Sequence, residues 1–174
     1  MKPKLLIISD LFGFENSTWI KRYLVLLESH FQLQLYDSIE LAEIDKTNLS
    51  PDQLHSVFVN GGIEKAVKKL FSLEKEEVNI LAFSIGGTIG WKAGLLGLDI
   101  KHFYAVSSTR LRYESMKPNS IINLIFGEND INKPDKAWFL GLNLKGEILK
   151  NGNHEIYRTH QVMNDLCERI KLAV

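Results

Sequence analysis

The chain reads Asn79-Ile80-Leu81-Ala82-Phe83-Ser84-Ile85-Gly86-Gly87-Thr88-Ile89-Gly90-Trp91 near its middle. An apolar run of strand length stops at Ser84, two glycines follow, and the segment beyond them is compatible with a helix. A strand that turns sharply into a helix through a serine holds that hydroxyl at the carboxyl edge of a parallel sheet. Such a turn leaves no room for Cβ atoms, which explains the small residues Ala82, Gly86 and Gly87. The pattern A-x-S-x-G-G departs from the strict G-x-S-x-G only by its alanine.

Two later loops carry the residue types that a serine nucleophile needs. Residues 121–126 read as a buried strand, and Asp130 lies in the loop beyond it. Residues 147–149 read as a short strand, and His154 lies in the loop that follows. Because sites in open parallel sheets form at the carboxyl ends of the strands, we expect Ser84, Asp130 and His154 to converge.

These three residue types act together in acyl transfer. A serine hydroxyl is a weak nucleophile near neutral pH, so an imidazole has to take its proton during attack. A carboxylate orients the imidazole and stabilises its protonated form. The oxyanion that develops needs fixed N–H donors. We expect one donor to be Ile85, directly after the nucleophile, and the other to come from the loop of residues 9–14.

These segments resemble the α/β-hydrolase superfamily, and within it a minimal dienelactone hydrolase. The loop Asp10-Leu11-Phe12-Gly13 is similar to that family's acidic–aliphatic–Phe–Gly segment, so the resemblance implies that Leu11 donates the second oxyanion N–H. The turn around Ser84 resembles the family's nucleophile turn, where dienelactone hydrolase itself has cysteine. Serine at this position favours ordinary ester or thioester hydrolysis. Compact serine hydrolases of the retinoblastoma-binding-protein-9 group are an alternative relative.

The same resemblance implies substrate contacts. Residues 152–159 are similar to the family's histidine loop, in which an arginine four residues after the histidine helps to bind a substrate carboxylate, and Arg158 falls at that position. Phe12 is a second candidate for substrate contact. Asp10 falls where the family has a glutamate that interacts with the resting thiol. Arg110 and Arg112 follow the fourth predicted strand and could also meet an anionic substrate.

Strand and helix signals alternate along the chain, which predicts an α/β fold with helices on both faces of a parallel sheet. We expect one domain over residues 1–174: a three-layer, doubly wound sheet of about six strands, with the order 2-1-3-4-5-6 that the resemblance implies. The short link of residues 107–120 leaves no room for a cap domain, so the pocket should be shallow and formed by loops alone. Residues 37–51 should form its mobile rim. The predicted strands are Leu5–Ser9, Leu33–Tyr36, Val78–Phe83, Phe103–Val106, Ile121–Phe126 and Glu147–Leu149, and the predicted helices are Thr18–Ser29, Ile63–Leu73, Gly86–Leu96, Pro134–Phe139 and Thr159–Leu172.

Composition narrows the class of partner. The chain has 21 basic and 21 acidic residues, and this balance argues against nucleic acid or an anionic membrane as partner. Cys167 is the only cysteine, which excludes a disulfide framework and favours the cytoplasm. His154 and His160 are not spaced as two metal ligands on one helical face. We therefore expect a small-molecule substrate, no metal or cofactor, and a monomer or homodimer.

Alternative readings remain open. Ser84 could simply cap a helix, Asp130 could form a turn or cap the helix expected near Pro134, and Arg158 could lie on a helix surface. The whole chain could be a catalytically inactive α/β-hydrolase fold that acts as a binding module. A flavodoxin-like or receiver-like domain that uses Asp10 fits less well, because residues 9–17 are apolar and acidic rather than rich in Ser, Thr and Gly.

Overall fold

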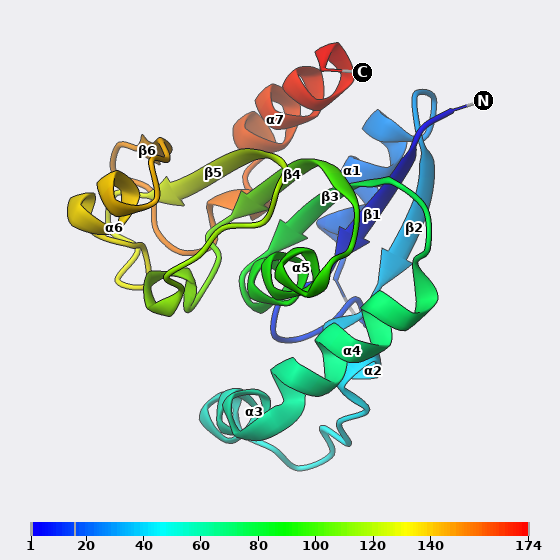
Figure 1. Cartoon of the computed structure of the whole chain (residues 1–174), viewed down its shortest axis with the longest axis vertical. Coiled ribbons are helices and arrows are strands. Elements are labelled where there is room, and N and C mark those ends of the chain that lie inside the picture. Colours follow the sequence, from blue (N-terminus) through cyan, green and yellow to red (C-terminus); the bar gives the residue numbers. More distant parts are fainter. Residues whose placement is uncertain (1, 16, 174) are drawn as a thin grey trace.

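A parallel six-stranded sheet forms the centre of the computed structural model, which describes residues 2–15 and 17–173 (Figure 1). The strand order is β2-β1-β3-β4-β5-β6, and every neighbouring pair is parallel. The expected fold class, strand number and order are therefore confirmed. The strands are β1 (Lys4–Ile8), β2 (Gln32–Tyr36), β3 (Val78–Phe83), β4 (Ile100–Val106), β5 (Ile121–Gly127) and β6 (Gly146–Leu149).

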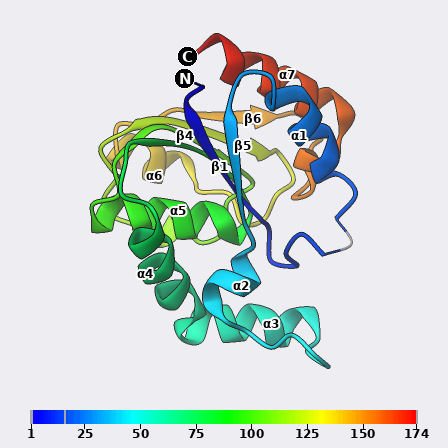
Figure 2. The same ribbon diagram turned by 90° about the vertical axis from the view of Figure 1, so that its right-hand side faces the viewer.

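Helices cover both faces of this sheet. Helices α1 and α7 pack together on one face, whereas α4 and α5 pack together on the other (Figures 1 and 2). Short turns of π- or 3₁₀-helix complete the chain. The helices are α1 (Ile20–Leu27), α2 (Ser38–Ala42), α3 (Pro51–Val57), α4 (Ile63–Leu73), α5 (Ile85–Leu96), α6 (Lys136–Gly141) and α7 (His160–Leu172), and the short turns are η1 (Phe58–Gly62), η2 (Leu111–Tyr113) and η3 (Ile156–Arg158).

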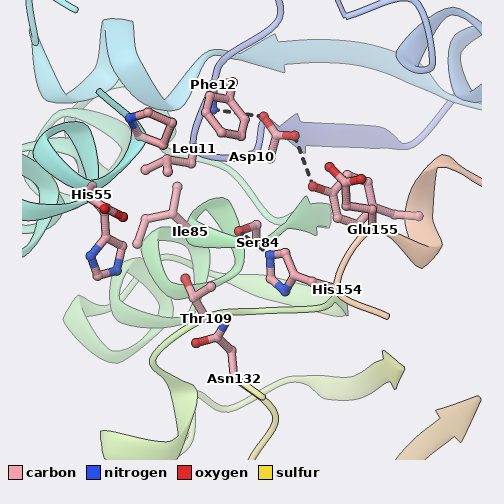
Figure 3. Close-up of a pocket in the computed structure, with 13 residues that line it drawn as sticks. Asp10, Leu11, Phe12, His55, Ser84, Ile85, Thr109, Asn132, His154 and Glu155 are labelled. Atoms are coloured by element: carbon pink, nitrogen blue, oxygen red, sulfur yellow. Dashed lines mark hydrogen bonds between the residues drawn. The ribbon is translucent and has the colours of Figure 1, made fainter. Parts of the chain in front are cut away.

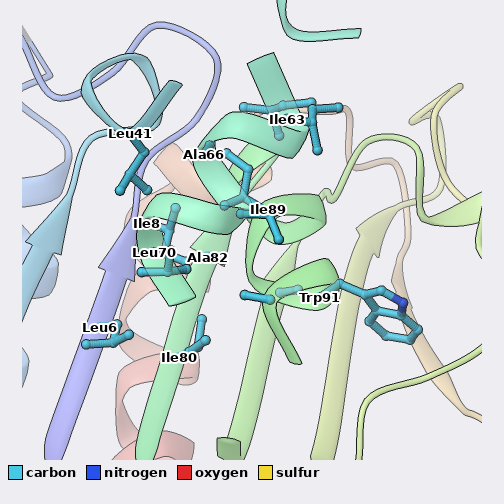
Figure 4. Packing of buried hydrophobic residues seen from close by; sticks show 14 of the residues in the cluster. Leu6, Ile8, Leu41, Ile63, Ala66, Leu70, Ile80, Ala82, Ile89 and Trp91 are labelled. Atoms are coloured by element: carbon cyan, nitrogen blue, oxygen red, sulfur yellow. The ribbon is translucent and has the colours of Figure 1, made fainter. Parts of the chain in front are cut away.

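The alternation of side chains along each strand divides the core in two. In β1, Leu5 and Ile7 point to the face covered by α1 and α7, whereas Leu6 and Ile8 point to the face covered by α4 and α5. All four side chains are fully buried. Figure 4 shows the hydrophobic cluster on the face covered by α4 and α5, where side chains from β1 and β3 pack against those of the two helices. This burial on both faces explains the nearly continuous apolar run of the central strand β3, whereas the edge strands β2 and β6 are more polar and exposed.

Two helices between β2 and β3 were not expected. The stretch of residues 37–51, predicted to be a mobile rim, contains α2, and α3 starts at its end. The Asp37 carboxylate caps α2, and the Ser50 hydroxyl caps α3 by accepting from the N–H of Gln53. The mobility predicted for this stretch stays a prediction.

The connection from β4 to β5 contains only η2, as its short length predicted. No cap domain interrupts the described part of the chain at that point. Within residues 2–15 and 17–173, no helix has both the length and the apolar composition that crossing a bilayer requires.

Candidate active site

Ser84 occupies a strained turn between β3 and α5. Its φ of 50° and ψ of −120° are unusual for a residue with a side chain. Glycine at position 86 permits the turn, because a Cβ atom there would lie 2.3 Å from the backbone oxygen of Ser9. Ser84 is the residue before the first turn of α5, yet its side chain makes no capping hydrogen bond. The hydroxyl is therefore free for another partner, which argues against the capping role.

That partner is His154. The Ser84 Oγ lies 3.0 Å from His154 Nε2 (Figure 3). On the other side of the ring, His154 Nδ1 lies 2.8 Å from Asp130 Oδ2. Both contacts are satisfied when the imidazole proton is on Nδ1, because Nδ1–H then donates to the carboxylate and Nε2 accepts from the hydroxyl. The structure thus brings the three predicted residues into one hydrogen-bonded chain. Ser84 and Asp130 are buried, whereas the His154 side chain is 30% exposed.

Backbone contacts hold the acid loop against the histidine loop. The N–H of Glu128 donates to Leu149 O at 2.9 Å, and the N–H of Asn129 donates to Gly152 O at 2.8 Å. The Asp130 Oδ1 also accepts from the N–H of Asn132 at 2.8 Å, which fixes the orientation of the carboxylate. Asp130 does not cap the next helix, because Asp135 does so for α6.

The two expected oxyanion donors lie beside the nucleophile. Leu11 and Ile85 line the same cavity as Ser84. Among the described residues, neither backbone N–H donates a hydrogen bond. Two such N–H groups beside one cavity are available to donate hydrogen bonds to an oxygen atom that becomes negatively charged during a reaction.

A cavity of about 260 Å³ opens beside Ser84 and His154. Phe12 is 44% exposed and lies in its wall, as expected for a residue that contacts substrate. The wall also includes residues of α3, so the prediction of a pocket formed by loops alone is wrong. Figure 3 shows this wall, which consists of Asp10, Leu11, Phe12, Pro51, Asp52, His55, Ser84, Ile85, Thr109, Asn132, His154, Glu155 and Tyr157.

Arg158 does not line this cavity. One of its terminal nitrogens lies 2.9 Å from Asp10 Oδ2, and the other lies 2.7 Å from Glu155 Oε1. The free guanidinium expected for a substrate carboxylate is thus already paired. Arg110 and Arg112 do not line the cavity either, and Arg112 donates to the backbone oxygen of Asn132 at 2.9 Å.

Several wall residues were missed from the sequence. The sequence analysis gave no role to Asp52, His55, Thr109 or Asn132. The first two lie on α3, which the motif Ser50-Pro51-Asp52-Gln53 could have revealed as a capping box with proline in the first turn. Nothing in the sequence marks Thr109, whose buried hydroxyl has no hydrogen-bond partner among the described residues.

No group of three or more His, Cys, Asp or Glu side chains within the described residues is placed to hold a metal ion.

Comparisons by sequence gave no relative. No family model matches the chain, and no curated protein matches it. Solved structures do match over nearly the whole chain. A dienelactone hydrolase-like promiscuous phosphotriesterase from metagenomic libraries is 12% identical, with a TM-score of 0.73, and the match covers 98% of this chain and 86% of that one.

Two further structures give the same result. A monoacylglycerol lipase from Paleococcus ferrophilus is 13% identical, with a TM-score of 0.68 and coverage of 98% of this chain and 94% of that one. An α/β hydrolase enzyme from the sediment metagenome of the Mar Chica lagoon, Morocco, is 14% identical, with a TM-score of 0.65 and coverage of 99% and 92%. At such low identity the structural likeness establishes the fold alone. The reaction has to be inferred from the residues of the site. The strand order, the turn at Ser84 and these neighbours together show that the chain adopts the α/β-hydrolase fold.

Proposed function

We propose that this protein is a serine hydrolase that cleaves a small ester or thioester through an acyl-enzyme. The observation that carries the proposal is the hydrogen-bonded chain from Asp130 through His154 to Ser84 at the wall of a cavity. The naming of structural neighbours as a lipase and a phosphotriesterase supports hydrolysis as the class of reaction.

The geometry suits a two-step acyl transfer. The Ser84 Oγ attacks the substrate carbonyl carbon while His154 Nε2 accepts the hydroxyl proton. The Leu11 and Ile85 N–H groups donate to the carbonyl oxygen as it becomes negative. When the intermediate collapses, His154 returns the proton to the leaving group. A water molecule, deprotonated by His154 in the same way, then releases the acid and restores Ser84.

The cavity favours a short and uncharged acyl group. Its volume of about 260 Å³ lies just below the roughly 300–1,000 Å³ typical of small-molecule sites. No lysine or arginine lines it, whereas Asp10, Asp52 and Glu155 do. An anionic substrate would meet carboxylates without a free cation, because Arg158 is held by Asp10 and Glu155. We therefore propose an uncharged substrate in place of a carboxylated one.

Labelling with a fluorophosphonate probe, alongside hydrolysis of p-nitrophenyl acetate, tests the proposal. We expect wild-type protein to react and Ser84→Ala to lose both labelling and turnover. Asp130→Asn should lower turnover by a factor on the order of 10³–10⁴, because the imidazole would no longer be held in the productive tautomer. The control is Ser72→Ala, an exposed serine on α4, which should behave as wild type.

The non-catalytic binding module predicts a different result. Wild-type protein would then be inert towards both the probe and the ester while remaining folded. Equal labelling of wild type and Ser84→Ala would instead show that another residue reacts, and the role of Ser84 would be withdrawn.

A further inference from the structure

Arg158 connects two segments that are far apart in the chain. Its guanidinium contacts Asp10, at the end of β1, and Glu155, in the histidine loop. The same group lies 5.5 Å from the ring centroid of Tyr157 and 6.0 Å from that of Trp19. The guanidinium thus lies near two aromatic rings while its two terminal nitrogens pair with two carboxylates, of which Asp10 is buried and Glu155 is half-exposed.

Asp10 is buried and fully engaged. It is 1% exposed, and its Oδ1 accepts from the N–H of Phe12 at 3.0 Å. Its Oδ2 accepts from the Tyr157 hydroxyl at 3.1 Å and from Arg158 at 2.9 Å. Leu11 lies between Asp10 and Phe12, so the carboxylate fixes the turn that presents the Leu11 N–H. A buried carboxylate of this kind needs a cationic partner to remain charged.

The residues next to Asp10 and Glu155 in the chain take part in the proposed reaction. Asp10 directly precedes Leu11, and Glu155 directly follows His154. Resting on the proposed function, we infer that Arg158 is a positioning residue that sets the Leu11 N–H relative to His154 by holding Asp10 and Glu155 together. In this role Arg158 does not touch the substrate, which agrees with its absence from the cavity wall.

The charge state of Arg158 is consistent with this role. Burial acts to lower the pKa of Arg158, but the hydrogen bond that Arg158 donates to Asp10 and the nearby negative charges outweigh it and raise that pKa. The pKa of Tyr157 is also raised, first by burial and then by the charge of Asp10, so its hydroxyl remains a donor.

The test compares Arg158→Met and Arg158→Lys with Arg169→Met. The control removes another arginine–carboxylate pair, the exposed contact between Arg169 and Glu147, far from the cavity. For Arg158→Met we expect kcat for p-nitrophenyl acetate to fall by about 10–100-fold, part of the loss typical of a whole oxyanion donor. KM should change by less than about threefold, because the ester ground state does not use this geometry. Arg158→Lys should recover only part of kcat, since one ammonium cannot pair with both carboxylates as the guanidinium fork does.

Two further readouts separate positioning from general damage. The affinity for a phenylboronic acid, which mimics the tetrahedral intermediate, should fall in parallel with kcat/KM in Arg158→Met. Amide hydrogen exchange at Phe12 should become faster in Arg158→Met and stay unchanged in Arg169→Met, because the acceptor Asp10 loses its anchor. Asp10→Asn combined with Arg158→Met should cost little more than either change alone.

The possible results are distinguishable. A reactive wild type with unchanged kcat and boronate affinity in Arg158→Met would overturn the positioning role and leave the proposed function standing. A selective loss of activity on a succinate half-ester, with activity on the matched butyrate ester retained, would overturn it in favour of carboxylate binding. An unreactive wild type would overturn the proposed function itself. If Arg158→Met does not fold, the comparison is made on Arg158→Lys, and full wild-type kcat there would overturn the proposal.

Discussion

At the scale of single residues, the site depends on how closely the backbone approaches itself around Ser84. A Cβ atom on Gly86 would lie 2.3 Å from the backbone oxygen of Ser9 and 2.9 Å from that of Ile8. Neither atom can move without shifting β1, whose end carries the loop with Leu11. The glycine thus couples the packing of α5 on the sheet to the position of Leu11, the second oxyanion donor that we propose.

Gly86→Ala should therefore destabilise the protein by about 1–3 kcal/mol, as overpacking against fixed atoms does. We also expect slower fluorophosphonate labelling, because the turn at Ser84 has to shift. The control is Gly141→Ala at the end of α6, where a Cβ atom would meet nothing within 4 Å. Urea denaturation of the two variants checks this prediction, and equal midpoints would contradict it.

Some residues of the site could be predicted and others could not, for a physical reason. Ser84, Asp130 and His154 were found because each lies in the loop after a predicted strand, so the sheet itself brings them together. The partners of Arg158 were not found, because a long side chain can reach several groups and the fold selects among them. Nothing in the structure supports the family-based expectation of a substrate carboxylate at Arg158, because both of its terminal nitrogens already pair with Asp10 and Glu155.

At the scale of elements, α3 forms part of the cavity wall although the rest of the wall consists mainly of loops. Its start is fixed by a reciprocal pair of hydrogen bonds, in which Ser50 accepts from the Gln53 N–H and Gln53 accepts from the Ser50 N–H. Asp52 and His55 of this helix face the cavity. The stability of a short helix thus bears on the shape of the acyl site.

Ser50→Ala should cost about 1 kcal/mol, the usual value for loss of an N-terminal cap. We expect KM for p-nitrophenyl butyrate to rise with little change in kcat, because α3 touches the acyl site and not the reacting atoms. Ser56→Ala in the same helix is the control, since its exposed hydroxyl donates only to the backbone oxygen of Asp52. Thermal denaturation and steady-state kinetics measure both variants. A larger effect from Ser56→Ala would show that the cap is not what holds the helix.

The strands were predictable and the helices α2 and α3 were not. The buried central strands have apolar runs of strand length bounded by glycine or polar turns, and this combination of length and flanking residues favours a strand over a helix. Helices of five and seven residues are too short to show a period, so only their caps identify them. Asp37 and Ser50 are such caps, and they lie within a polar stretch that resembles a loop.

At the scale of the whole molecule, one of the two cores buries groups that have to stay uncharged. Burial raises the pKa of Cys167, on α7, from 9.0 to about 12. Burial also raises the pKa of Tyr23 well above its ordinary value. Both groups lie in the core between the sheet and helices α1 and α7.

Stability should therefore fall in alkaline solution. Up to about pH 9 both the folded and the unfolded chain keep the Cys167 thiol protonated, so this group has no effect there. Between pH 9 and about 12 the unfolded chain loses the proton first, which favours unfolding. Urea denaturation from pH 7 to 11 should show a decline that is shallower in Cys167→Ala, measured relative to that variant's own stability at pH 7. An identical decline in both proteins would contradict the assignment to Cys167.

The strand order of the sheet was predicted from the resemblance to a superfamily more than from the residues of the strands. Apolar runs establish that strands exist, but strand order depends on which crossovers place helices on which face. The order β2-β1-β3-β4-β5-β6 was expected because the segments around Leu11, Ser84 and His154 resemble one superfamily, and the structure confirms it.

The strained backbone at Ser84 has a consequence for how this chain would change under mutation and selection. A residue with a side chain in that conformation costs on the order of 1–3 kcal/mol, which glycine would avoid. If the hydroxyl served no reaction, drift to glycine at position 84 would make the protein more stable at no loss. Serine at position 84 lowers the stability of the fold, so selection would keep it only while its hydroxyl takes part in a reaction. A lineage that no longer needed the reaction would gain stability by replacing Ser84 with glycine and would lose activity at the same time.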